Sequence, residues 1–142
     1  MEAAQVERRL AAILAIDVVG YSRLVEEDEA GTLAALRKLH AEVIAPLLVK
    51  HHGRVVKLMG DGAIAEFGSV VDAVTCAVAP QKEIAAVQAG SPRERHIIFR
   101  MGINLGDVVV DGADLLGDGV NVAARLEQLC EPRGITDFWH RL

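Results

Sequence analysis

An apolar run near the N-terminus most constrains the fold of this chain. Residues 10–19, LAAILAIDVV, are hydrophobic except for Asp17, and Gly20 follows them. The run is too short to cross a bilayer and is interrupted by a charge. It predicts a β-strand that is buried along its length and presents one carboxylate at its end.

A second aspartate, Asp61, lies in a Gly-Asp-Gly turn between two short expected strands, 54–59 and 63–67. Asp-Gly is a common hairpin signal, so Asp61 alone favours a turn residue, and Asp17 alone could be a paired buried charge. If the strands lie side by side, both carboxylates reach one edge of the sheet. Such paired carboxylates suit Mg²⁺ and two-metal phosphoryl chemistry.

Composition narrows the class of protein. The chain has 142 residues, which fits one domain, and a formal net charge of −5. It has no cluster of Lys or Arg, which argues against a nucleic-acid-binding surface. Cys76 and Cys130 are far apart among apolar residues, which is typical of buried thiols in a cytosolic protein. The acidic first residues do not resemble a signal peptide, and we expect a cytoplasmic protein without a membrane span.

The remaining pattern predicts an α+β fold. After the first strand we expect a short acidic helix and then a helix over 33–47 that Pro46 kinks or ends. The hairpin around Asp61 follows, and then come a helix over 70–87, strands over 97–103 and 107–110, and a helix over 119–129. This order contains the ferredoxin-like βαββαβ core, with an extra helix and hairpin. In that core the first strand lies beside the hairpin that carries Asp61.

A second set of polar residues stands out against apolar neighbours. Asn121 and Arg125 are four residues apart and would share one helix face, where arginine suits phosphate and asparagine can donate or accept. For this pair alone, a solvated helix edge is the simpler interpretation. Lys57 interrupts a short strand and could be an edge lysine that faces water. Asp114 is an isolated acid, and Arg100 lies within a strand, where a charge needs solvent or a partner.

Four separated motifs occur in an order that resembles the catalytic domain of class III adenylate and guanylate cyclases. They are IDVVGYS (16–22), KLMGDG (57–62), RMGINLG (100–106) and GDGVNVAARL (117–126). The resemblance covers about residues 10–134 and is more specific than a single glycine motif. It implies a ferredoxin-like core and a head-to-tail homodimer with two active sites at its interface. It also implies conversion of ATP to cyclic AMP and pyrophosphate.

The resemblance also implies roles for particular residues. The metal ligands for two Mg²⁺ or Mn²⁺ ions would be Asp17, Asp61 and the backbone carbonyl of Val18. The triphosphate would lie on the backbone of residues 18–22, including Gly20, Tyr21 and Ser22, and Arg100 would contact phosphates. Lys57 and Asp114 match the pair that recognises adenine. The catalytic residues would be Asn121, which orients the ribose, and Arg125, which stabilises charge on the α-phosphate. Lys57, Asp114, Asn121 and Arg125 would come from the protomer opposite the metals.

The resemblance ends after Gly134. The strand that the family shows next, and a later phosphate-binding lysine, have no counterpart in residues 135–142. We therefore expect a lead-in over 1–9, a C-terminally truncated or altered cyclase domain over 10–134, and a divergent tail over 135–142. An alternative is a catalytically inactive cyclase-homology module that dimerises and regulates a partner. A diguanylate cyclase is disfavoured because the chain has no Gly-Gly-Asp/Glu-Glu-Phe run.

Overall fold

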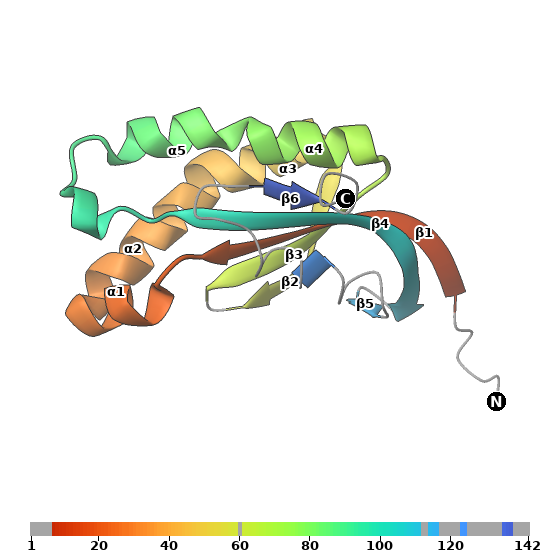
Figure 1. The fold of residues 1–142 in the computed structure, drawn as a ribbon, viewed down its shortest axis with the longest axis horizontal. Helices are drawn as coiled ribbons and strands as arrows, with labels where there is room; N and C mark the ends of the chain where they lie inside the picture. Colours follow the sequence, from red (N-terminus) through yellow and green to blue (C-terminus); the bar gives the residue numbers. More distant parts are fainter. Residues whose placement is uncertain (1–6, 60, 112–113, 117–122, 125–134, 138–142) are drawn as a thin grey trace.

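The computed structural model describes residues 7–59, 61–111, 114–116, 123–124 and 135–137. The helices and strands follow one another along the chain in the order β1 (Glu7–Val18), α1 (Tyr21–Glu27), α2 (Glu29–Leu39), the π-helical turn η1 (His40–Ile44), α3 (Ala45–Lys50), β2 (Gly53–Met59), β3 (Gly62–Phe67), α4 (Val70–Val78), α5 (Pro80–Gln88), the 3-10 turn η2 (Arg93–Arg95), β4 (Phe99–Asp111), β5 (Asp114–Leu116) and β6 (Ile135–Asp137). The helices from α1 to α5 lie on one face of the sheet (Figure 1).

The sheet confirms the predicted ferredoxin-like core. Its strand order is β2-β3-β1-β4-β5, and β6 pairs with β4. Strand β1 is antiparallel to both β3 and β4, so it lies beside the hairpin that carries Asp61. In this register Asp17 is opposite Gly62 on one side and Arg100 on the other.

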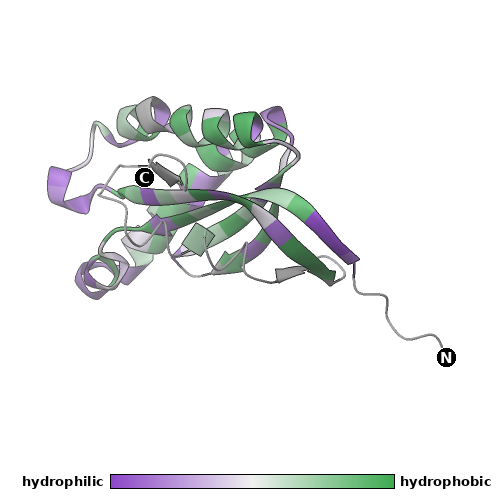
Figure 2. Cartoon of the chain, turned by 45° about the vertical axis from the view of Figure 1, so that its right-hand side comes forward, coloured by the Kyte–Doolittle hydropathy of each residue, from purple (hydrophilic) through white to green (hydrophobic). Residues whose placement is uncertain are grey.

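Strand β1 is the central strand of the sheet, and from Ala11 onward both of its faces are largely buried. Ala12, Leu14 and Ile16 pack with the helices, whereas Ala11 and Ile13 belong to a smaller cluster on the opposite face. This two-sided burial explains why the strand is a nearly continuous apolar run. Successive side chains still point to opposite faces of the sheet, but both faces require apolar residues. Figure 2 shows hydrophobic residues along the strands and hydrophilic residues at the N-terminal end of β1.

Several predicted boundaries were wrong. The strands expected over 97–103 and 107–110 form one strand, β4, because Gly106 stays paired with Ala11 of β1. The single helix expected over 70–87 is two helices, α4 and α5, because Pro80 begins the second one. Proline lacks the N–H that would continue the first helix. Residues 135–137 form β6, parallel to β4, where no strand was expected.

Pro46 distorts its helix, as predicted, but does not end it. The turn before it, His40–Ile44, is π-helical, and the backbone N–H of Ala45 donates to the carbonyl of His40. A proline ring clashes with the carbonyl four residues earlier, here that of Glu42, and a wider turn is one way to remove that clash. Helix α3 then continues to Lys50.

The structure bears on one of the two cysteines. Cys76 of α4 is a free, buried thiol, as expected, and burial raises its pKa to about 11. Cys130 lies outside the described residues. Among the described residues, no helix is long and apolar enough to cross a membrane.

Candidate active site

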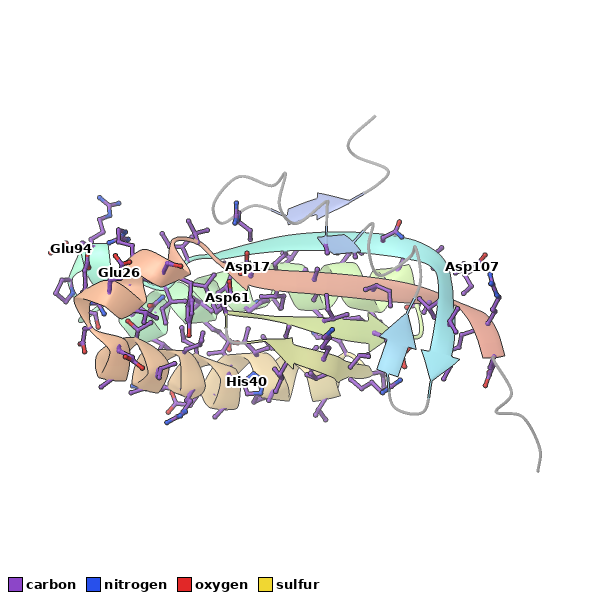
Figure 3. All side chains as sticks on the ribbon, turned by 90° about the horizontal axis from the view of Figure 1, so that it is seen from below. Asp17, Glu26, His40, Asp61, Glu94 and Asp107 are labelled. Carbon is purple, nitrogen blue, oxygen red and sulfur yellow. The ribbon has the colours of Figure 1, made fainter. Side chains whose placement is uncertain are left out.

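The site is built where β1 ends beside the tip of the β2-β3 hairpin. The backbone N–H of Val18 donates to the carbonyl of Asp61 at 2.9 Å, which fixes the hairpin tip against the end of β1. Gly62 is required at this contact, because a Cβ there would collide with the backbone carbonyl oxygen of Ile16. The sequence thus brings the two predicted aspartates together, as Figure 3 shows.

The carboxylates of Asp17 and Asp61 interact directly. Burial raises the pKa of Asp17 above its ordinary value, and a side-chain hydrogen bond with Asp61 and the like charge of Asp61 raise it further. The backbone N–H of Val18, 2.8 Å from Oδ1 of Asp17, and the charge of Arg100 act in the opposite direction. Two acids this close share a proton more readily than isolated ones, because full ionisation places like charges together.

Arg100 is the cationic neighbour of this pair. It lies opposite Asp17 in β4, and its Nη2 is 3.4 Å from Oδ2 of Asp17. Both side chains are about one quarter exposed, at 28% and 24%. The charge within β4 that the sequence left unexplained therefore has a partner at the carboxylate pair.

The loop after β1 leads directly into the start of α1. Gly20 has φ of 65°, the left-handed conformation that favours glycine, and it immediately precedes α1. Its carbonyl accepts from the N–H of Leu24 at 3.1 Å. No side chain caps this end of α1, so backbone N–H groups at Tyr21 and Ser22 stand at an uncapped helix start.

The predicted purine-recognising residues are only partly located. Lys57 is exposed on β2, opposite Ile64, after a register shift in the hairpin. Since Ile64 belongs to the cluster on the Asp17 side of the sheet, Lys57 also projects from that side. Asp114 begins β5, where it pairs with Asp111 of β4. Asn121 and Arg125 lie outside the described residues, although Ala123 between them is fully buried against that same cluster.

The donor set at this end of the sheet fits a divalent cation held together with substrate. Within the described ranges, no group of three or more His, Cys, Asp or Glu side chains gathers around a possible metal position. The pair Asp17 and Asp61 instead supplies two carboxylates, and Mg²⁺ is commonly bound through one or two carboxylates plus substrate phosphates. Burial first, and then the neighbouring Asp61 carboxylate, raise the pKa of Asp17, and a bound cation would offset both effects by stabilising the ionised form.

One ionic cluster was missed by sequence reasoning. Glu66 of β3 accepts two hydrogen bonds from Arg9 of β1, at 2.7 and 2.9 Å, and one from Arg54 of β2, at 2.5 Å. Arg9 and Glu66 are 57 residues apart, so only the strand register brings them together. No local pattern in these strands indicates this cluster.

Comparison with known proteins identifies the family. The family model described as "Adenylate and Guanylate cyclase catalytic domain" matches residues 4–136. A protein of Rhizobium meliloti (strain 1021) named "Putative adenylate cyclase 3" is 54% identical over 130 residues, which is 92% of this chain and 22% of that protein. An adenylate cyclase of Streptomyces coelicolor is 32% identical over 87% of this chain and 31% of its own length. The chain thus spans less than a third of either relative.

Solved structures agree with this result. An adenylate/guanylate cyclase/hydrolase from Silicibacter pomeroyi superposes with a TM-score of 0.84 at 43% identity, over 92% of this chain and 76% of that one. The adenylyl cyclase CyaB from P. aeruginosa gives 0.79 at 27% identity, over 92% and 77%. The fold is that of a class III nucleotide cyclase domain. This chain belongs to the adenylate and guanylate cyclase catalytic domain family.

Proposed function

We propose that this domain converts ATP to 3′,5′-cyclic AMP and pyrophosphate. The observation that carries the proposal is the Asp17–Asp61 carboxylate pair, held at one end of the sheet in a cyclase-family fold. In the reaction, the ribose 3′-oxygen forms a bond to the α-phosphorus. The bond from the α-phosphorus to the bridging oxygen of pyrophosphate breaks, and the hydroxyl proton is lost.

Asp17, Asp61 and the backbone carbonyl of Val18 would hold two Mg²⁺ or Mn²⁺ ions. When bound, such ions lower the pKa of an attacking hydroxyl and stabilise charge on the leaving phosphates. The uncapped N–H groups at Tyr21 and Ser22 would bind the triphosphate, as helix starts bind anions, whereas the N–H groups of Val18 and Val19 already donate to the carbonyls of Asp61 and Ile98. Arg100, which forms an ion pair with Asp17, would contact a phosphate at the same end of the sheet.

The other roles rest on matching motifs. Asn121 would orient the ribose, and Arg125 would stabilise charge on the α-phosphate, a kind of contact whose loss costs about 10²–10³ in rate. Cyclase domains of this family work as dimers. We infer a homodimer in which these two residues and the purine-recognising residues complete the site that holds the partner's metals.

Selection of ATP over GTP tests the substrate. Lys57 would donate to an adenine ring nitrogen and Asp114 would accept from the exocyclic amino group, which guanine replaces with a carbonyl. Sites whose polar groups are left unpaired reject the wrong base strongly. Turnover with Mn²⁺, followed by chromatography of both products, should favour ATP, and the Lys57→Glu, Asp114→Cys double variant should lose that preference.

The matched control is Lys50→Glu, which reverses an exposed lysine at the end of α3, outside the matched motifs. It should keep the preference for ATP. Equal turnover of ATP and GTP by the unaltered chain would refute the assignment. Nucleotide-dependent Mn²⁺ binding without turnover would instead indicate an inactive nucleotide-binding module, and absence of both would indicate a purely regulatory one.

Mixing two inactive variants tests the shared site. The Asp17→Asn chain lacks a metal ligand, and the Arg125→Ala chain lacks the arginine that each site takes from the other protomer. In a mixed dimer, one of the two sites therefore combines an intact Asp17 with an intact Arg125. Random mixing makes half of the dimers mixed, and about a quarter of the unaltered rate should return. If both variants dimerise and no activity returns, the site is not shared.

A further inference from the structure

A cavity of about 300 Å³ lies on the helix side of the sheet, next to the hairpin tip. Its walls come from α2, η1, β1 and the β2-β3 hairpin, and most of its lining is apolar, including Leu33, Leu36, Ile44 and Leu58. Leu58 is 64% exposed, so an apolar side chain of the cavity wall is open to solvent. The volume is at the lower end of the range for small-molecule sites, roughly 300–1,000 Å³.

The rim of this cavity carries a positive charge. Arg37 and His40 line it from α2 and η1, and Arg37 has no hydrogen-bond or ion-pair partner among the residues that the structure describes. A guanidinium stays charged at any physiological pH and pairs well with carboxylate, sulfonate or phosphate groups. Asp61 also borders the cavity, but its carboxylate is hydrogen-bonded to Asp17.

The cavity wall includes the irregular part of the helix. His40 and Ile44 are the first and last residues of the π-helical turn, and both line the cavity; Figure 3 labels His40 on this helix. Turns of this kind occur frequently at functional sites. Here the wider turn places an imidazole and an apolar side chain on the same wall.

We propose that this cavity binds a small amphiphilic anion, with its apolar or aromatic body inside and its acidic group on Arg37. The charge complementarity selects an anion over a neutral molecule, and the volume admits a body of about two fused rings. Because Asp61 and Gly62 border the cavity, a bound molecule also contacts the turn that carries one of the proposed metal ligands. The effect on turnover therefore rests on the proposed function, whereas the binding itself does not.

The probe is 8-anilinonaphthalene-1-sulfonate, whose fluorescence rises in an apolar site, compared with the uncharged N-phenyl-1-naphthylamine. The sulfonate should bind with one-to-one saturation and more tightly than the neutral probe. Arg37→Gln should weaken the sulfonate about three- to tenfold, the effect of one charge-assisted contact at a partly exposed position. It should leave the neutral probe unchanged.

Two controls separate this cavity from other apolar surface. Lys38→Gln removes the adjacent positive charge, which does not line this cavity, and should change sulfonate affinity less than twofold. Leu36→Trp and Ala63→Leu fill the cavity from opposite walls, and whichever of them retains the native circular dichroism spectrum should abolish saturable binding. Equal weakening by Arg37→Gln and Lys38→Gln, or unchanged binding in the filled variants, would overturn the proposal.

A second copy of the chain is the competing occupant. If sulfonate binding is lost as protein concentration drives dimerisation, the cavity is covered by the partner and the proposal is wrong. If binding is kept at all concentrations, an added sulfonate should also change Mn²⁺-dependent turnover, and Arg37→Gln should shift that dose response by the same factor. If the chain binds the sulfonate as expected but shows no turnover, the proposed cyclase function is wrong and the cavity proposal stands.

Discussion

Carboxylates at the two ends of one sheet face have opposite kinds of neighbours. At one end, Glu66 is 11% exposed and accepts from two arginines, Arg9 and Arg54. At the other end, Asp17 has a second carboxylate, Asp61, beside it and an ion pair with Arg100. The first arrangement neutralises a buried charge and joins β1, β2 and β3. The second concentrates negative charge, which costs stability in the absence of a cation.

The difference separates a structural carboxylate from a functional one. Alternation along β1 places Arg9 and Asp17 on the same face, eight residues apart, so burial alone does not distinguish the two ends. What distinguishes them is the ratio of acids to arginines in contact. Two carboxylates that lie next to each other at the end of a sheet repel each other, and such a pair is a stronger indication of cation binding than either acid alone.

Replacing either aspartate should produce the largest effect. Asp17→Asn and Asp61→Asn should each lower Mn²⁺-dependent turnover by more than roughly 100-fold, the upper range for losing residues that only orient metal ligands. Thermal unfolding should show an intact fold. Near-normal turnover in either variant would show that the pair does not hold the metals.

Unlike turnover, the stability of the fold without metal should rise in Asp17→Asn. Since the folded-state pKa of Asp17 is raised, the folded state binds its proton more tightly than the unfolded chain, and stability is lost as pH rises through that pKa. Asp17→Asn removes this loss. Without added metal, the variant should gain stability relative to the unaltered chain as pH rises above about 4, the ordinary aspartate value, and denaturant titrations at several pH values measure this.

Replacing Glu66 should lower the stability of the fold and leave turnover nearly unchanged. Glu66→Gln leaves Arg9 and Arg54 without their carboxylate, and the free energy of unfolding should fall by about 1–3 kcal/mol, less than for a fully buried pair because both arginines are partly exposed. Turnover per folded molecule should stay within a few-fold of normal. Glu27→Gln is the matched control, since Glu27 also contacts two arginines but at the surface, and it should destabilise less. Loss of turnover in Glu66→Gln without loss of stability would break the contrast.

How much of this could be predicted from the sequence differs between the two ends. The Asp17–Asp61 pair was predictable, because an apolar run that ends in an acid and an Asp-Gly turn are both local signals, and the βαββαβ order joins them. The Glu66 cluster depends on strand register across 57 and 12 residues, which no local pattern specifies. Gly106 shows the same limit, because its pairing with Ala11 of β1 continues the strand through an expected break. The break between α4 and α5 is different, because Pro80 is itself a local signal for the end of one helix and the start of the next.

Replacing Arg100 and Arg9 one at a time by glutamine should give the smallest effect and the most specific test. Arg100→Gln removes the cation beside Asp17, so Mn²⁺ without nucleotide should bind about three- to tenfold more tightly, the scale of one screened charge at a partly exposed site. Arg9→Gln removes an equal charge from the far end of the same face and should leave Mn²⁺ affinity unchanged while lowering stability. Calorimetric titration of both variants measures the difference. Equal Mn²⁺ affinity in the two variants would mean that Arg100 does not compete with a cation for Asp17. A tighter Mn²⁺ site combined with weaker nucleotide binding in Arg100→Gln alone would place both the metal and the phosphates at the carboxylate end of the sheet.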